Sequence, residues 1–167
     1  VHHHLIGEGL RCDANIVVET ASARDSHQIA CLIGFGATAV YPYLAYSVLE
    51  DLMRSGELLG EPGACFKNYR RGVNKGLLKI MSKMGISAVS SYRGAQLFEA
   101  VGLDRDVVDL SFCGVTSRIG GSGFAELEAD TKRLARDAWL DPKPIQQGGL
   151  LKYVHGQEYH AFNPDVV

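Results

Sequence analysis

The sequence lacks most of the features that place a chain in a special class. No apolar run reaches the roughly 18 residues of a membrane-spanning helix. A net charge of −2 and a pI near 6.3 give no overall reason to expect binding to nucleic acid or to an anionic membrane. The cysteines include no C-x-x-C pair, so neither a zinc site nor a disulfide scaffold is favoured and we expect reduced thiols. They are Cys12, Cys31, Cys65 and Cys113.

A complete catalytic constellation is also missing. No nucleophile stands beside a base and an orienting acid, and no pair of carboxylates brackets a glycine-lined pocket. There is no starting methionine or signal peptide, and Val1 lies inside what reads as structure, so we expect a fragment. With 167 residues and 46% hydrophobic composition, the chain has the length of one ordinary domain.

A strongly basic amphipathic helix is predicted over residues 68–84, with Asn68 as its N-cap. Apolar residues recur at helical spacing, and a second row at steps of four is basic, with no acidic residue between its members. The row consists of Lys67, Arg71, Lys75, Lys79 and Lys83, with Arg70 beside it. One explanation is a solvated face or a contact with an acidic neighbouring domain. The alternative is a non-enzymatic interaction module in which the basic helix, residues 67–83, binds an acidic partner.

The hydrophobic period changes after this helix. Gly85 ends it, and residues 86–90 are predicted to form a brief buried strand because they are few and partly β-branched. Residues 95–101 are predicted as a short helix closed by Gly102. This is half of an α/β unit, which would place Ser87 and Ser90 near the carboxyl end of a strand, where such folds hold ligands.

Alternating signals also precede the basic helix. We expect strands at residues 15–19 and 37–41 and helices at 26–35 and 44–54, which implies parallel βα repeats. Residues 55–66 have the glycine and proline content of a linker. The fold class is therefore α/β.

The rest of the chain predicts helices at residues 104–112 and 124–140, separated by the glycine-rich CGVTSRIGGSG. That stretch fits neither the phosphate-loop nor the dinucleotide pattern, which argues against a phosphate site. Histidines occur at residues 2–4, 27, 155 and 160. We expect no metal site, because adjacent histidines on a strand would point to opposite faces and loop histidines are commonly surface residues.

Two stretches carry a family resemblance. NKGLLKIMSKMGIS and the following SYRGAQLFEA closely resemble the opening of the FMN-binding domain of the glutamate synthase family, in its large subunit or its ferredoxin-dependent single-chain form. HHHLIGEGLR followed by ANIVVET resembles a segment near the end of that family's central domain. The resemblance implies that residues 1–55 end the central domain, 56–66 link the domains, and 67–167 begin the FMN-binding domain. Each part would hold incomplete (β/α) barrel elements, with MSKMGIS supplying the first barrel strand.

The resemblance also implies a reaction for the parent protein. Ammonia from glutamine is transferred to 2-oxoglutarate and reduced to glutamate with FMN and an iron–sulfur cluster, whose cysteine ligands lie outside this segment. A small reductase subunit or ferredoxin would be a partner, in the cytoplasm or a plastid, with NADPH, NADH or ferredoxin left open as electron donor. The segment alone should be inactive.

Site residues follow from the position of the predicted strand. The candidates for FMN contact are Met84, Gly85, Ile86, Ser87 and Ser90, with Arg93 and Gln96 on the substrate side. The alternative is that Ser87 and Ser90 are small residues that pack in a crowded barrel.

Overall fold

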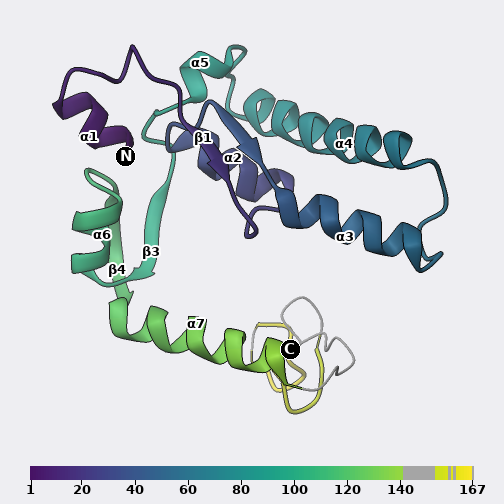
Figure 1. Cartoon of the computed structure of the whole chain (residues 1–167). Helices are drawn as coiled ribbons and strands as arrows, with labels where there is room; N and C mark the ends of the chain where they lie inside the picture. Colours follow the sequence, from purple (N-terminus) through teal and green to yellow (C-terminus); the bar gives the residue numbers. More distant parts are fainter. Residues whose placement is uncertain (141–152, 158, 160, 167) are drawn as a thin grey trace. The chain divides into compact units, whose positions relative to one another are not determined.

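The computed structural model describes residues 1–140, 153–157, 159 and 161–166. The chain forms two units, Val1–Gly123 and Phe124–Val167. The first unit holds two β-α-β motifs and a layer of helices, and the second holds one long helix (Figure 1).

The first motif consists of β1 (Val17–Glu19), α2 (Ser26–Gly34) and β2 (Ala39–Tyr41). The two strands pair in parallel with Val18 opposite Val40, which confirms the predicted parallel repeat. A capping box starts α2: the Asp25 carboxylate accepts from the Gln28 backbone N–H at 2.8 Å, and the Gln28 side chain accepts from the Asp25 N–H.

The second motif consists of β3 (Glu99–Leu103), α6 (Arg105–Ser111) and β4 (Thr116–Ser122), again with parallel strands. Asp104 caps α6 as predicted, its carboxylate accepting from the Asp106 N–H at 3.0 Å. The predicted helix at 95–101 is wrong, because its second half pairs with β4. The register shifts on either side of Val101, and Gly102 has φ +77°. A Cβ on Gly121 would lie 2.3 Å from the Gly102 oxygen, so the glycines permit this close pairing.

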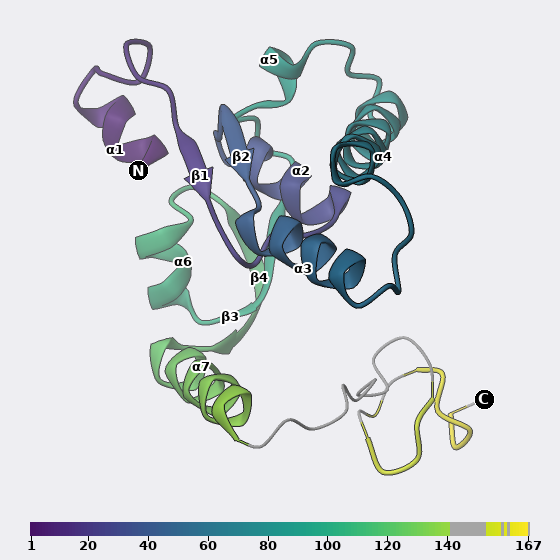
Figure 2. The same ribbon diagram turned by 45° about the vertical axis from the view of Figure 1, so that its right-hand side comes forward.

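Helix α4 (Pro62–Lys83) lies beside both α2 and α3 (Tyr43–Arg54), as both ribbon views show (Figures 1 and 2). The prediction of Asn68 as N-cap is wrong: α4 begins at Pro62, whose fixed φ suits a first helical turn, after the N-cap Glu61. Residues 62–66 of the expected linker are therefore helical.

Contacts join the two sides of that linker. The Tyr69 hydroxyl donates to the Arg24 carbonyl at 2.8 Å, and its ring meets the Tyr46 ring edge-on at 5.5 Å. Ala30 of α2, Met81 of α4 and Tyr92 of α5 (Val89–Tyr92) form the buried core. Residues 1–55 and 68–101 thus belong to one packed unit, and the division of the chain between two domains of a longer protein stays a prediction.

The α/β class is confirmed, as two small parallel sheets with helices. No closed barrel is present in the part of the chain that the structure describes, and the derivation from two partial barrels stays a prediction. The predicted final helix is confirmed as α7 (Phe124–Trp139). The prolines expected to end it, Pro142 and Pro144, lie outside the described residues, as does His160.

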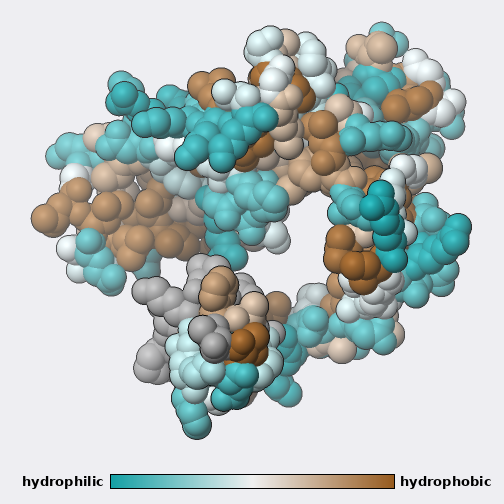
Figure 3. Space-filling model, turned by 180° about the vertical axis from the view of Figure 1, so that it is seen from behind, coloured by the Kyte–Doolittle hydropathy of each residue, from teal (hydrophilic) through white to brown (hydrophobic). Residues whose placement is uncertain are grey.

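The surface mixes apolar and polar side chains. In the space-filling view from behind, brown hydrophobic patches lie between teal hydrophilic ones (Figure 3). Large apolar side chains such as Leu78 of α4 and Val89 of α5 are more than half exposed. None of the helices among the described residues is long and apolar enough to cross a bilayer.

Candidate functional site

The predicted flavin contacts lie where α4 ends. Gly85 has φ +71° and follows the C-cap Met84, which is the usual place for a glycine after a helix. The Ile86 N–H donates back to the Met81 carbonyl at 2.9 Å, which closes the helix and turns the Ile86 side chain toward the core. MSKMGIS therefore ends a helix, and its assignment as the first barrel strand is wrong.

The predicted strand at 86–90 is also wrong: residues 86–88 are irregular and α5 begins at Val89. Ile86 and Val89 are the segment's β-branched residues, and they are three apart, which is helical spacing. Ser87 and Ser90 are both exposed in this chain, and their roles in FMN contact or in barrel packing stay predictions. No strand edge brings them together.

A hollow of about 390 Å³ lies at this helix end. Three of the predicted residues, Gly85, Ile86 and Ser87, line it with Leu78, Met81 and Ser82. The other four do not: Met84 is exposed beside it, Ser90 and Gln96 are exposed, and half-buried Arg93 caps α5.

These residues fit part of a flavin site. Apolar side chains and two serine hydroxyls suit the edge of an isoalloxazine ring. FMN also carries a phosphate, which proteins commonly hold with cations or a helix N-terminus. The lining includes no charged side chain, and the helix end that it uses is a C-terminus. This segment would therefore supply one wall of such a site but not the groups that bind the phosphate.

A second hollow lies between α2, α4 and α5, and sequence reasoning did not identify it. It measures about 270 Å³ and is lined by Ile33, Asn74, Leu77, Leu78, Ile80, Met81, Val89 and Tyr92. The Tyr92 hydroxyl is buried and has no hydrogen-bond partner among the residues that the structure describes. The signal available in the sequence was Leu78, an apolar residue beside the predicted stripe.

Arg11 and His2 hold the N-terminal helix α1 (His2–Gly7) against the first unit. The Arg11 guanidinium donates to His2 Nδ1 at 2.9 Å and to the carbonyls of Ala14 and Gly36 at 2.7 and 2.8 Å. Burial, the Arg11 charge, His3 and the chain's amino terminus lower the pKa of His2. The residues predicted to precede a strand thus form a helix, and His2 is a neutral hydrogen-bond acceptor.

The other shifted groups also have structural causes. Burial and Asp25 raise the pKa of Cys31, which makes its thiol less reactive. Burial raises the pKa of Tyr69, with Tyr46 and Asp25 contributing, and burial and Cys31 raise that of Tyr92. None of these shifts activates a nucleophile or a base at neutral pH.

The cysteines predicted to be reduced are all free. Among the residues that the structure describes, no three His, Cys, Asp or Glu side chains gather as ligands for a metal. His155 lies in a turn.

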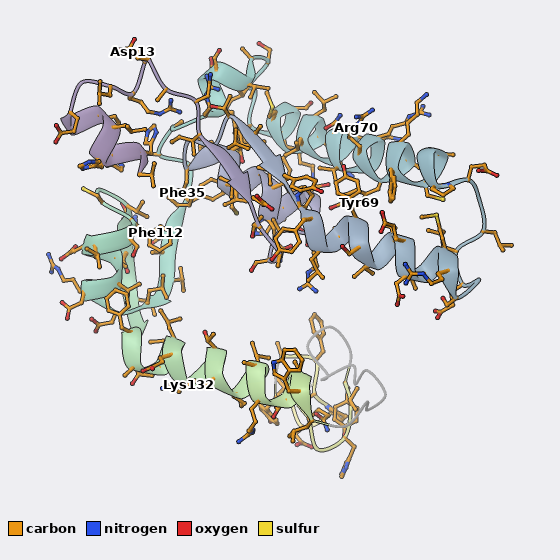
Figure 4. All side chains as sticks on the ribbon, viewed as in Figure 1. Asp13, Phe35, Tyr69, Arg70, Phe112 and Lys132 are labelled. Carbon is orange, nitrogen blue, oxygen red and sulfur yellow. The ribbon has the colours of Figure 1, made fainter. Side chains whose placement is uncertain are left out.

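The basic row on α4 is exposed along its whole length. Figure 4 shows Arg70 on the side of α4 away from α3 and Tyr69 between the two helices. Within the described residues, none of the row's cations forms an ion pair: these are Lys67, Arg70, Arg71, Lys75, Lys79 and Lys83.

Comparison with protein families gives a match to the glutamate synthase central domain over residues 1–104. The match runs through residues 56–66, where the sequence predicted a domain boundary, and through the predicted flavin contacts.

Similar curated proteins match along the whole chain. The glutamate synthase [NADPH] large chain of Bacillus subtilis (strain 168) is 42% identical over 169 residues, covering 100% of this chain. The ferredoxin-dependent glutamate synthase of Pyropia yezoensis is 45% identical over 181 residues, and the ferredoxin-dependent glutamate synthase 1 of Arabidopsis thaliana is 44% identical over 181 residues; each covers 99% of the chain. The chain spans only 11–12% of the length of these relatives.

Proposed function

The chain belongs to the glutamate synthase family, and we propose that it is a central-domain segment of a polypeptide that makes glutamate from 2-oxoglutarate and glutamine-derived ammonia. The supporting observation is identity of 42–45% along essentially the whole chain to relatives of both the NADPH and the ferredoxin-dependent kind. FMN and an iron–sulfur cluster would carry the electrons, and a reductase subunit or ferredoxin would deliver them.

Within that polypeptide, the segment acts as scaffold and as one wall of the flavin site. Its shifted titratable groups have structural causes, and its helix-end hollow offers hydroxyls and apolar atoms without a cation. Backbone and side chains of Gly85, Ile86 and Ser87 contact FMN, while Met84, Ser90, Arg93 and Gln96 lie near the bound flavin and substrate. The phosphate and the cluster are held by sequence beyond this chain.

The division into domains is part of the same proposal. Residues 1–55 end the central domain's fold, and residues 67–167 lead toward the FMN-binding domain. The match to the central-domain family model runs through residues 56–66 without interruption and ends at Asp104. The change from one domain to the next is therefore not marked by a break in the match at the predicted linker.

The test compares the full-length polypeptide with the 167-residue chain. The full-length protein, supplied with glutamine, 2-oxoglutarate and reduced ferredoxin or NADPH, is expected to form glutamate. The isolated chain is expected to form none and to leave FMN fluorescence unchanged at micromolar concentration, because one wall cannot enclose a flavin. A full-length protein without this activity would refute the proposed function, and stoichiometric quenching by the isolated chain would refute the scaffold role.

A further inference from the structure

We propose that the hollow between α2, α4 and α5, with the basic stripe that leads to it, is the docking site for an acidic amphipathic helix from another part of the same full-length polypeptide. The inference rests on the proposed function, since it places this chain within a longer glutamate synthase. The docking hollow shares Leu78 and Met81 with the helix-end hollow proposed to contact FMN, whereas the stripe's cations line neither hollow.

The stripe is defined by helical spacing on α4. Lys67, Arg71, Asn74 and Leu78 follow one another at steps of four, three and four, so they lie along one side of the helix. All four are exposed, and Leu78 is 65% exposed at the rim of the hollow. The stripe therefore runs from an apolar hollow to two cations, with Lys75 flanking it one turn from Leu78.

The positive charge of residues 62–98 favours an acidic occupant of the docking site. Residues 62–98 contain no aspartate or glutamate, and the stripe's cations form no ion pair in the described part of the chain. At 1.5 Å per residue, Arg71 lies about 10 Å and Lys67 about 16 Å along the helix from Leu78. A helix lying along the stripe would match it with an apolar side chain in the hollow and carboxylates about two and three turns away.

The size of the hollow favours an inserted side chain over a cofactor. A cavity of about 150 Å³ lined by aliphatic and aromatic groups holds a benzene-sized group. At about 270 Å³, this hollow has room for one large apolar side chain, and it is smaller than the roughly 300–1,000 Å³ of small-molecule sites.

The small size of the hollow also favours an occupant that belongs to the same polypeptide as this chain. One apolar anchor and a few exposed ion pairs give weak binding between separate molecules, because surface ion pairs contribute little. A covalent connection raises the effective concentration of the partner to about the millimolar range, where such a contact becomes occupied. The relatives supply that length, since this chain spans 11–12% of them.

Zero-length carbodiimide crosslinking of the full-length protein, followed by mass spectrometry, tests the proposal, because it joins a lysine amine to a carboxylate in contact with it. Lys67 and Lys75 are expected to crosslink to one acidic segment of the same polypeptide. Lys83, five residues beyond Leu78 and well round the helix from the stripe, is the control and should remain uncoupled to that segment. Crosslinks to a separate protein, or between isotopically distinguished copies, would overturn the assignment, as would free amines at Lys67 and Lys75.

A substitution at the rim separates docking from mere proximity. Leu78→Asp should lower the yield of both crosslinks by about tenfold, since it puts a charge into the apolar hollow. Leu134→Asp on α7 is the matched control, because Leu134 is 63% exposed, and should leave the yield unchanged. Equal yields in the two variants would overturn the proposal. Glutamate formation is assayed on the unsubstituted full-length protein: activity without the crosslinks refutes the docking site alone, and the crosslinks without activity refute the proposed function alone.

Discussion

Gly76 lies where α4 crosses α2, and replacing it with alanine is expected to destabilise the protein. A Cβ at this position would lie 2.1 Å from Oγ and 2.5 Å from Cβ of Ser26. The serine Cβ cannot rotate away, so we place the cost at the upper end of overpacking values, about 3 kcal/mol. Alanine also favours the helix by about 1 kcal/mol over glycine. The net effect of Gly76→Ala is therefore a loss of about 2 kcal/mol.

Gly72 provides a control one turn earlier on the same helix. A Cβ there meets nothing within 4 Å, so Gly72→Ala should stabilise the protein by about 1 kcal/mol. Urea unfolding of the purified variants, followed by far-ultraviolet circular dichroism, should separate the two by about 3 kcal/mol. Adding Ser26→Gly removes both clashing atoms and should recover at least half of the loss in the Gly76→Ala background. If Gly76→Ala stabilises as much as Gly72→Ala, α2 and α4 do not pack as described.

Three further outcomes are expected. Since the pKa of His2 is lowered in the folded chain, its stabilising contribution is complete above the ordinary value near 6.5 and is lost as the pH falls from there toward the lowered pKa. Urea midpoints should therefore drop as the pH falls below about 6.5 and drop less in His2→Asn; equal drops would contradict this. Tyr92→Phe removes a buried hydroxyl without a partner and should leave the free energy of unfolding unchanged or raise it by about 1 kcal/mol, whereas a loss above about 1 kcal/mol would reveal a bound partner. In the full-length protein, Ser87→Leu should reduce the FMN content, because the bulky side chain fills the helix-end hollow. Lys79→Ala should leave the FMN content unchanged, because Lys79 is exposed and lies outside that hollow. The reverse result would move the flavin surface to the basic helix.

Elements with local signals were predictable from the sequence. Asp104 caps α6 where its side chain was expected to, and the apolar period of residues 124–140 gave α7 almost to the residue. The first β-α-β motif was predictable for a similar reason: both strands are β-branched and short, and a polar turn ending at Asp25 leads into the helix between them.

The second motif was missed because its strands depend on pairing. β4 contains three glycines or serines in its last three positions and is mostly exposed, so neither propensity nor alternation marks it as a strand. Its partner β3 begins in a segment that has helical spacing. The ladder between them is a non-local interaction, and the register shifts around Val101 show that it does not follow a strict two-residue period.

The hollow beside α4 could not be predicted, because it depends on which parts of an apolar helix are left uncovered. The apolar spacing of α4 predicted a buried face, on which Leu77 and Ile80 are half-buried but Met84 is exposed. Met81, which lies outside that spacing, is 6% exposed and packs with Ala30 and Tyr92. The apolar surface is wider than the helices that cover it, however: α2 covers one side and the short α5 only its far end, which leaves Leu78 at the rim. Whether a leucine at helical spacing is core or docking surface is decided by its neighbours in space. Leu78 lies on the stripe that carries Lys67 and Arg71, which form no ion pair among the described residues, and this alignment is the observation on which the proposed partner rests.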